Sequence, residues 1–119
     1  MTDKELLELA AKAAGIKGGF EQDPAYKWQE RQNWVIPYNN NGLMSGIVWN
    51  PLTDDGDALR LAVKLQLKVQ HFPLAVVVEY NGNTHIEINE LVNEDNGDRY
   101  AATRRAIVRA AAEIGKVMK

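Results

Sequence analysis

A continuous apolar run from Leu74 to Val78 constrains the fold of this chain more than any other segment. A strand with one face in water alternates polar and apolar residues, whereas a continuous run indicates a strand that is covered on both faces. The Asn81-Gly82 pair after the run is a strong hairpin signal. We therefore predict a central buried strand at about residues 74–80, within a hairpin of about residues 74–91.

Three segments with helical spacing accompany this hairpin. Thr2 and Glu5 have the spacing of a capping box, ahead of a helix at about residues 3–14. A group of acidic residues introduces a second helix at about residues 55–66, and its apolar composition predicts that this helix is largely buried. A third helix at about residues 99–118 would be about 30 Å long.

The order of the elements predicts the fold class. A further hairpin is expected at residues 34–49, and residues 15–38 otherwise show no clear period. We predict an α+β fold of the α/β/α sandwich type, in which a small antiparallel or mixed sheet packs between the three helices. At 119 residues the chain has the length of one domain, so residues 1–119 are assigned to a single domain.

Composition excludes several classes of protein. The chain has no cysteine, which rules out disulfides, thiolate metal sites and a cysteine nucleophile. It has no run of about 18 apolar residues, and residues 1–9 carry acidic rather than basic charges, unlike a secretory signal. We expect a cytoplasmic protein that does not enter a membrane.

Charge is distributed unevenly along the chain. The net charge is −2, yet residues 99–119 hold six basic side chains and one acidic side chain, a net charge of +5. A local positive face on an acidic protein suits an anionic small molecule or an acidic protein surface. Long duplex nucleic acid favours more basic domains and is an unsuitable partner.

Two segments carry a family resemblance. WNPLTDDGDALRLAVKL, Trp49–Leu65, and YAATRRAIVRAAAEIG, Tyr100–Gly115, resemble the signature stretches of the phage ABA-sandwich domain family. These are small proteins of tailed phages and prophages of enteric bacteria, and the match covers 33 of the 119 positions. The resemblance implies an α/β/α sandwich. It implies no catalytic residues, because members of the family are mostly of unassigned function.

The first of these segments contains three neighbouring carboxylates, Asp54, Asp55 and Asp57. Carboxylates around a glycine turn can bind Ca²⁺ or Mg²⁺, but the spacing does not match an EF-hand loop. The alternative is a helix start that is rich in capping residues and in acids favoured by the helix dipole. We predict no metal site and no cofactor.

Trp49 and Asn50 stand directly before that helix. An aromatic ring beside an amide can stack on a nucleobase and form hydrogen bonds with it. The alternative is that Trp49 packs in the core, as tryptophan commonly does.

Arg104 falls within the apolar stripe of the last helix. A guanidinium on a buried face needs a partner, because an unpaired charge there costs several kcal/mol. The partner is either a carboxylate of Asp54, Asp55 or Asp57, or an anionic group of a ligand, which arginine can bind bidentately. The remaining basic residues of the last two helical segments are expected on solvated faces: Arg105, Arg109 and Lys116, and Arg60, Lys64 and Lys68.

Catalytic motifs do not identify an enzyme. Ser45 lacks the nucleophile-elbow pattern, His71 and His85 are too few for a zinc site, and neither a P-loop nor a Rossmann glycine pattern occurs. A carboxylate–metal hydrolase built on residues 54–57 is the least favoured alternative.

Two functional hypotheses remain. The first is a non-enzymatic phage or prophage protein of the host cytoplasm that sequesters a small anionic nucleotide-type ligand in counter-defence. Its expected ligand-binding residues are Trp49, Asn50, Asp54, Asp55, Asp57 and Arg104. The second is a protein-interaction module, as a monomer or homo-oligomer, that inhibits or recruits a host protein through Tyr26, Trp28 and Trp34.

Overall fold

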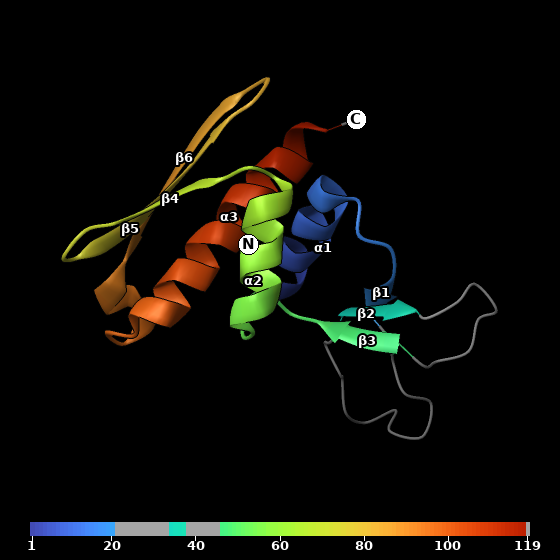
Figure 1. Ribbon diagram of the computed structural model, residues 1–119. Helices are drawn as coiled ribbons and strands as arrows, with labels where there is room; N and C mark the ends of the chain where they lie inside the picture. Colours follow the sequence, from blue (N-terminus) through green and yellow to red (C-terminus); the bar gives the residue numbers. More distant parts are fainter. Residues whose placement is uncertain (21–33, 38–45, 119) are drawn as a thin grey trace.

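The computed structural model describes residues 1–20, 34–37 and 46–118 (Figure 1). In chain order the elements are α1 (Asp3–Ala14), β1 (Gly19–Phe20), β2 (Trp34–Pro37), β3 (Gly46–Trp49), α2 (Asp55–Lys64), β4 (Lys68–His71), β5 (Ala75–Asn81), β6 (His85–Leu91), the short 3-10 helix η2 (Val92–Asp95) and α3 (Arg99–Val117). None of the helices in these ranges is long and apolar enough to span a bilayer.

Side-chain caps fix the starts of the three α-helices. The Thr2 hydroxyl accepts a hydrogen bond from the Glu5 backbone N–H at 3.2 Å, and Asp54 accepts one from the Asp57 N–H at 2.8 Å. Asp98 accepts from the first N–H groups of α3. These contacts satisfy backbone donors that a helix start leaves free. The predicted helices are confirmed, with ends that differ by no more than two residues.

The strands form two antiparallel sheets of three strands each. The second sheet has the order β4-β5-β6, so the predicted central strand is confirmed, and Val76, Val77 and Val78 of β5 are all buried. The first sheet has the order β1-β2-β3, in which β2 and β3 form the predicted hairpin at residues 34–49. The pairing of β1 with β2 was not predicted, because two residues carry no periodic signal.

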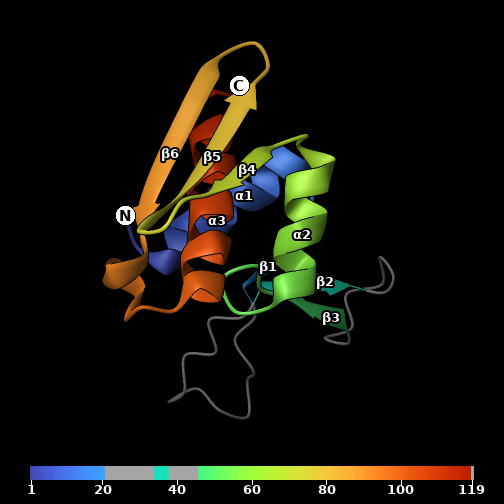
Figure 2. The same cartoon turned by 60° about the vertical axis from the view of Figure 1, so that its left-hand side comes forward.

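The helices gather on one side of the second sheet, and this confirms an α+β fold with helices packed on a sheet (Figure 2). The layer order differs from the expected sandwich, because α3 packs on β5 and β6 while α1 and α2 pack on α3. β6 therefore alternates between buried and exposed residues. Val77 is buried on the open face because Gln70 and Asn89 flank it on the neighbouring strands.

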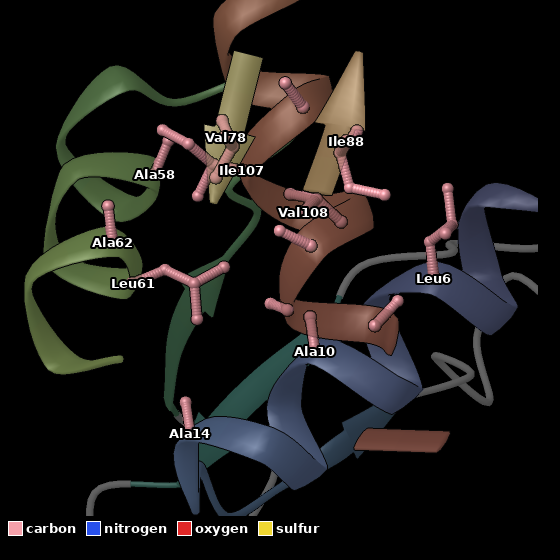
Figure 3. Close-up of a cluster of buried hydrophobic side chains, with 14 of the residues drawn as sticks. Leu6, Ala10, Ala14, Ala58, Leu61, Ala62, Val78, Ile88, Ile107 and Val108 are labelled. Atoms are coloured by element: carbon pink, nitrogen blue, oxygen red, sulfur yellow. The ribbon is translucent and has the colours of Figure 1, made fainter. Parts of the chain in front are cut away.

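The core lies where the helices meet the sheet, and Figure 3 shows its side chains converging from α1, α2, α3, β5 and β6. Many of these residues are alanines, which let the helix axes approach closely. At Gly115 of α3 the approach is closer still, since a Cβ atom there would lie 2.1 Å from the backbone oxygen of Leu9. The labelled residues are Leu6, Ala10, Ala14, Ala58, Leu61, Ala62, Val78, Ile88, Ile107 and Val108.

The prediction that the α2 segment is largely buried is wrong. Ala58, Leu61 and Ala62 are buried against the core, but Leu59 and Val63 are 64% and 68% exposed. The physical reason is that α2 packs along a single stripe, against α3, and its opposite side meets solvent. Leu59 also lines the groove described next.

Candidate functional site

An open groove of about 570 Å³ lies between α2, β4 and α3. Its walls are largely apolar, and the charged groups among its lining residues come from α2 and α3. The lining residues are Asp55, Ala58, Leu59 and Ala62 of α2, Val69 and His71 of β4, and Arg99, Tyr100, Thr103, Arg104 and Ile107 of α3.

Strand register and helical spacing bring these residues together. Val69 of β4 is paired with Val78, and His71 with Val76, so both point to the face of the sheet on which α3 lies. On α3, lining residues recur three and four positions apart, which places them on one side of a helix. The groove is therefore formed by one face of the edge strand β4 and by one side each of α2 and α3.

Arg104 joins the two segments that carry the family resemblance. Its Nε donates to the Leu52 carbonyl at 2.8 Å, and its Nη1 donates to Oδ1 of Asp55 at 2.6 Å. The Arg104 side chain is 17% exposed, whereas that of Asp55 is 68% exposed. Of the partners considered for Arg104, the structure shows a carboxylate, and that carboxylate belongs to Asp55.

The other two carboxylates point away from Arg104 and do not line the groove. Asp54 caps α2, and Asp57 accepts hydrogen bonds from the Asn50 N–H at 2.9 Å and from Arg60 at 2.7 Å. These contacts agree with a helix start rich in capping residues. In the part of the chain that the structure describes, no three His, Asp or Glu side chains are placed to hold a metal ion together.

Trp49 and Asn50 serve the fold in this structure. Trp49 is buried and packs edge-to-face against Trp34, with ring centroids 6.2 Å apart. Oδ1 of Asn50 accepts from the Leu52 N–H at 3.0 Å and shapes the turn before α2. The alternative of core packing therefore describes Trp49, and the groove does not include either residue.

Of the three aromatic residues predicted to be exposed anchors, the structure describes only Trp34. Trp34 is buried between Trp49 and Phe20, so its assignment as a surface anchor is wrong. An aromatic residue in a polar stretch can turn inward when a sheet places it against a core, which composition alone does not reveal. Tyr26 and Trp28 lie outside the described residues.

Sequence reasoning missed the second arginine of the groove, Arg99. Its Nη2 donates to the Pro73 carbonyl at 2.8 Å, while its buried Nη1 has no hydrogen-bond partner among the described residues. Tyr100, the next residue, is 72% exposed and also lines the groove. The available signal was the strong positive charge of residues 99–119, which did not identify individual residues.

A second charged cluster lies at the other edge of the second sheet, around Glu90 of β6. The Glu90 side chain is only 3% exposed; Arg109 donates a hydrogen bond to it, and Arg105 Nε lies 3.9 Å from its Oε1. Arg105 also pairs with Asp3 of α1 at 3.1 Å. The expectation that Arg105 and Arg109 lie on a solvated face holds in part: their side chains are 35% and 37% exposed, and the same face meets the inward side of β6.

Burial raises the pKa of Glu90 above its ordinary value of 4.5. The neighbouring Asp95 carboxyl raises this pKa further, whereas Arg109 lowers it without cancelling the effect of burial. One oxygen of Asp95 is buried without a hydrogen-bond partner among the described residues. A proton on Glu90 would provide a donor for this acidic pair.

We expect the raised pKa of Glu90 to make stability depend on pH. A carboxyl with a raised folded-state pKa contributes stability that is complete below 4.5 and is lost as pH rises through the folded pKa. Glu90→Gln removes this titration, so the wild type should lose stability relative to Glu90→Gln as the pH rises above 4.5. Urea unfolding across this range tests the expectation, with the exposed Glu87→Gln as control. Parallel profiles for the wild type and Glu90→Gln would contradict it.

Comparisons with family models, with curated proteins and with solved structures find no match for this chain.

Proposed function

We propose that this protein is a non-enzymatic binding protein that holds a small anionic ligand of nucleotide type in the groove between α2, β4 and α3. The observation that carries the proposal is the presence of two arginines, Arg99 and Arg104, in an otherwise largely apolar groove with an exposed tyrosine. Guanidinium groups match phosphate geometry, and an aromatic ring supplies a stacking surface for a base.

The two guanidinium groups are oriented by the main chain. The carbonyls of Leu52 and Pro73 each accept a hydrogen bond from one of them. Neutral carbonyls position the cations without neutralising them, and among the described residues that line the groove only Asp55 carries a negative charge. An anionic ligand would therefore meet an excess of positive charge that is already in place, which lowers the cost of ordering on binding.

The size of the groove agrees with a small ligand. Ligand sites in proteins commonly have volumes of roughly 300–1,000 Å³, and this groove has about 570 Å³. Tyr100 takes over the stacking role that the sequence suggested for Trp49. Of the six residues expected to bind the ligand, Asp55 and Arg104 line the groove.

The biological setting rests on the family resemblance of residues 49–65 and 100–115. On that basis we propose a phage or prophage accessory protein that acts in the host cytoplasm and sequesters a nucleotide-type signal of host defence. The groove combines both of these segments, since Asp55 comes from the first and Arg104 from the second.

Thermal unfolding in the presence of nucleotides tests the proposed function. A ligand at about 100 times its Kd should stabilise the protein by about 2.7 kcal/mol and raise its Tm. Mononucleotides, dinucleotides and their cyclic forms are compared with inorganic phosphate. We expect Tyr100→Ala to reduce the Tm shift caused by nucleotides but not that caused by phosphate, and Tyr100→Phe to restore it. No shift with any member of the panel would contradict the proposal.

A protein-interaction module is the second candidate, favoured by apolar side chains around the groove. Leu59 and Tyr100 line the groove and are exposed, and so are Phe72 and Leu74 in the turn that contacts Arg99. Exposed apolar groups that gather in one region indicate an interaction surface. Co-purification of a stoichiometric host protein without a small molecule would favour this candidate over the first.

A further inference from the structure

Asp55 accepts a hydrogen bond from a nitrogen of Arg104 that would otherwise be free to bind a ligand. Its Oδ1 lies 2.6 Å from Nη1 of Arg104, and both residues line the groove. The carboxylate is a planar anion with two acceptor oxygens, as is one edge of a phosphate or carboxylate group of a ligand. An anionic group that enters the groove therefore competes with Asp55 for Arg104.

We propose that Asp55 is an intramolecular substitute for the anionic group of the ligand, and that the ligand displaces it from Arg104 on binding. The inference rests on the proposed function of the groove. It predicts that the free protein keeps Arg104 paired and that binding exchanges one anion for another.

The exposures of the two partners indicate which of them moves. Asp55 is 68% exposed, so its carboxylate is already largely hydrated and can turn into solvent at little cost. Arg104 is 17% exposed and is held at Nε by the Leu52 carbonyl, and Arg99 is held by the Pro73 carbonyl. The cations therefore stay in place while the carboxylate leaves.

The start of α2 does not depend on the Asp55 carboxylate. Asp54 is the residue that caps the helix, through its hydrogen bond with the Asp57 N–H. In the described part of the chain, the ion pair of Asp55 is with Arg104 alone. Asp55 can therefore release Arg104 while the helix keeps its cap.

The positive charge of the groove selects the type of anion. A terminal phosphate monoester carries a charge of about −1.5 to −2 at pH 7, whereas a phosphodiester carries a single charge, like Asp55 itself. The doubly charged group gains more from the two guanidinium groups that line the groove and displaces Asp55 more readily. The ligand class is therefore a nucleotide with a terminal phosphate rather than one whose phosphates are all diesters.

Calorimetric titration of Asp55→Asn with AMP and with cyclic AMP tests this inference. AMP has a terminal phosphate monoester, and cyclic AMP has only a diester. Removing the competing charge should tighten AMP binding about fivefold, the upper range for an exposed ion pair. It should tighten cyclic AMP binding by a similar factor, because the same Asp55–Arg104 pair is broken whichever ligand enters, so the preference for AMP over cyclic AMP should be kept. Glu87→Gln makes the same charge change on the open face of β6 and is the matched control.

Each outcome separates the inference from the function on which it rests. Tighter binding to Asp55→Asn than to both the wild type and Glu87→Gln supports displacement. If all three proteins bind AMP with the same affinity, or Asp55→Asn binds it more weakly, displacement is overturned and the groove keeps its proposed function. If none of the three binds either nucleotide, the proposed function fails and the displacement model fails with it.

Discussion

Replacing Gly115 with alanine is expected to lower the free energy of unfolding by about 3 kcal/mol, the upper end of what overpacking costs. Gly115 is buried on α3, and an added Cβ would lie 2.1 Å from the oxygen and 2.8 Å from the carbonyl carbon of Leu9. These are backbone atoms of α1, so the clash is relieved only if the two helices separate. The gain in helix propensity of about 1 kcal/mol is too small to compensate.

Gly56→Ala is the matched control for this experiment. Gly56 is also helical, but its added Cβ would meet the mobile end of the Arg60 side chain at 3.1 Å and the capping oxygen of Asp54 at 3.2 Å. The guanidinium can rotate away, and a shift of a few tenths of an ångström relieves the contact with Asp54 while the cap is kept. We expect Gly56→Ala to be neutral or to stabilise by up to about 1 kcal/mol. Urea unfolding of both variants measures the difference. Equal effects of the two substitutions would contradict the close packing of α1 against α3.

Replacing Arg104 with methionine is expected to weaken both stability and ligand binding. The substitution removes the hydrogen bond to the Leu52 carbonyl and the ion pair with Asp55. Hydrogen bonds of charged groups contribute about 1.5–3 kcal/mol each. Because Asp55 is largely exposed, its ion pair with Arg104 contributes less than this to stability. We expect a loss of about 2 kcal/mol in the free energy of unfolding. Binding of AMP should weaken by at least about 30-fold, because the loss of a charge-assisted contact to phosphate costs about 2 kcal/mol.

Arg60→Met controls for the chemistry of this substitution. Arg60 is on α2, its side chain is 72% exposed, and it pairs with Asp54 and Asp57 outside the groove. An exposed ion pair of this kind contributes about 0–1 kcal/mol, so stability should change little and AMP affinity should be kept. Urea unfolding and calorimetric titration are compared for the two variants. If AMP affinity fell equally in both, Arg104 would have no specific role in the groove.

The ion pair between Arg104 and Asp55 shows how much of a tertiary contact local sequence patterns can predict. Helical spacing placed Arg104 within the apolar stripe of its helix, and the cost of an unpaired charge required a partner. The acids at the start of the second helix are the protein candidates for that partner. What spacing did not reveal was the choice among them, because Asp54 and Asp57 make local contacts at the helix start and only Asp55 faces α3.

The groove itself could not be predicted from the sequence. Arg99, Tyr100 and His71 line it because α3, α2 and an edge strand pack at particular angles, and no periodic signal records the angle between two elements. The same limit applies to Arg105 and Arg109. Their side of the helix was identified, but not the buried Glu90 that meets it.

Local patterns in the sequence were enough to predict the first two helix starts, the three helices, the central strand and the two main hairpins, because these depend on contacts between residues close together in the chain. The tertiary structure alone decided which faces were covered. It left Leu59 and Val63 in solvent, buried Trp34 and Trp49, and placed the helices on one side of the second sheet. The physical reason is that periodicity shows which side chains share a face, whereas burial depends on what packs against that face.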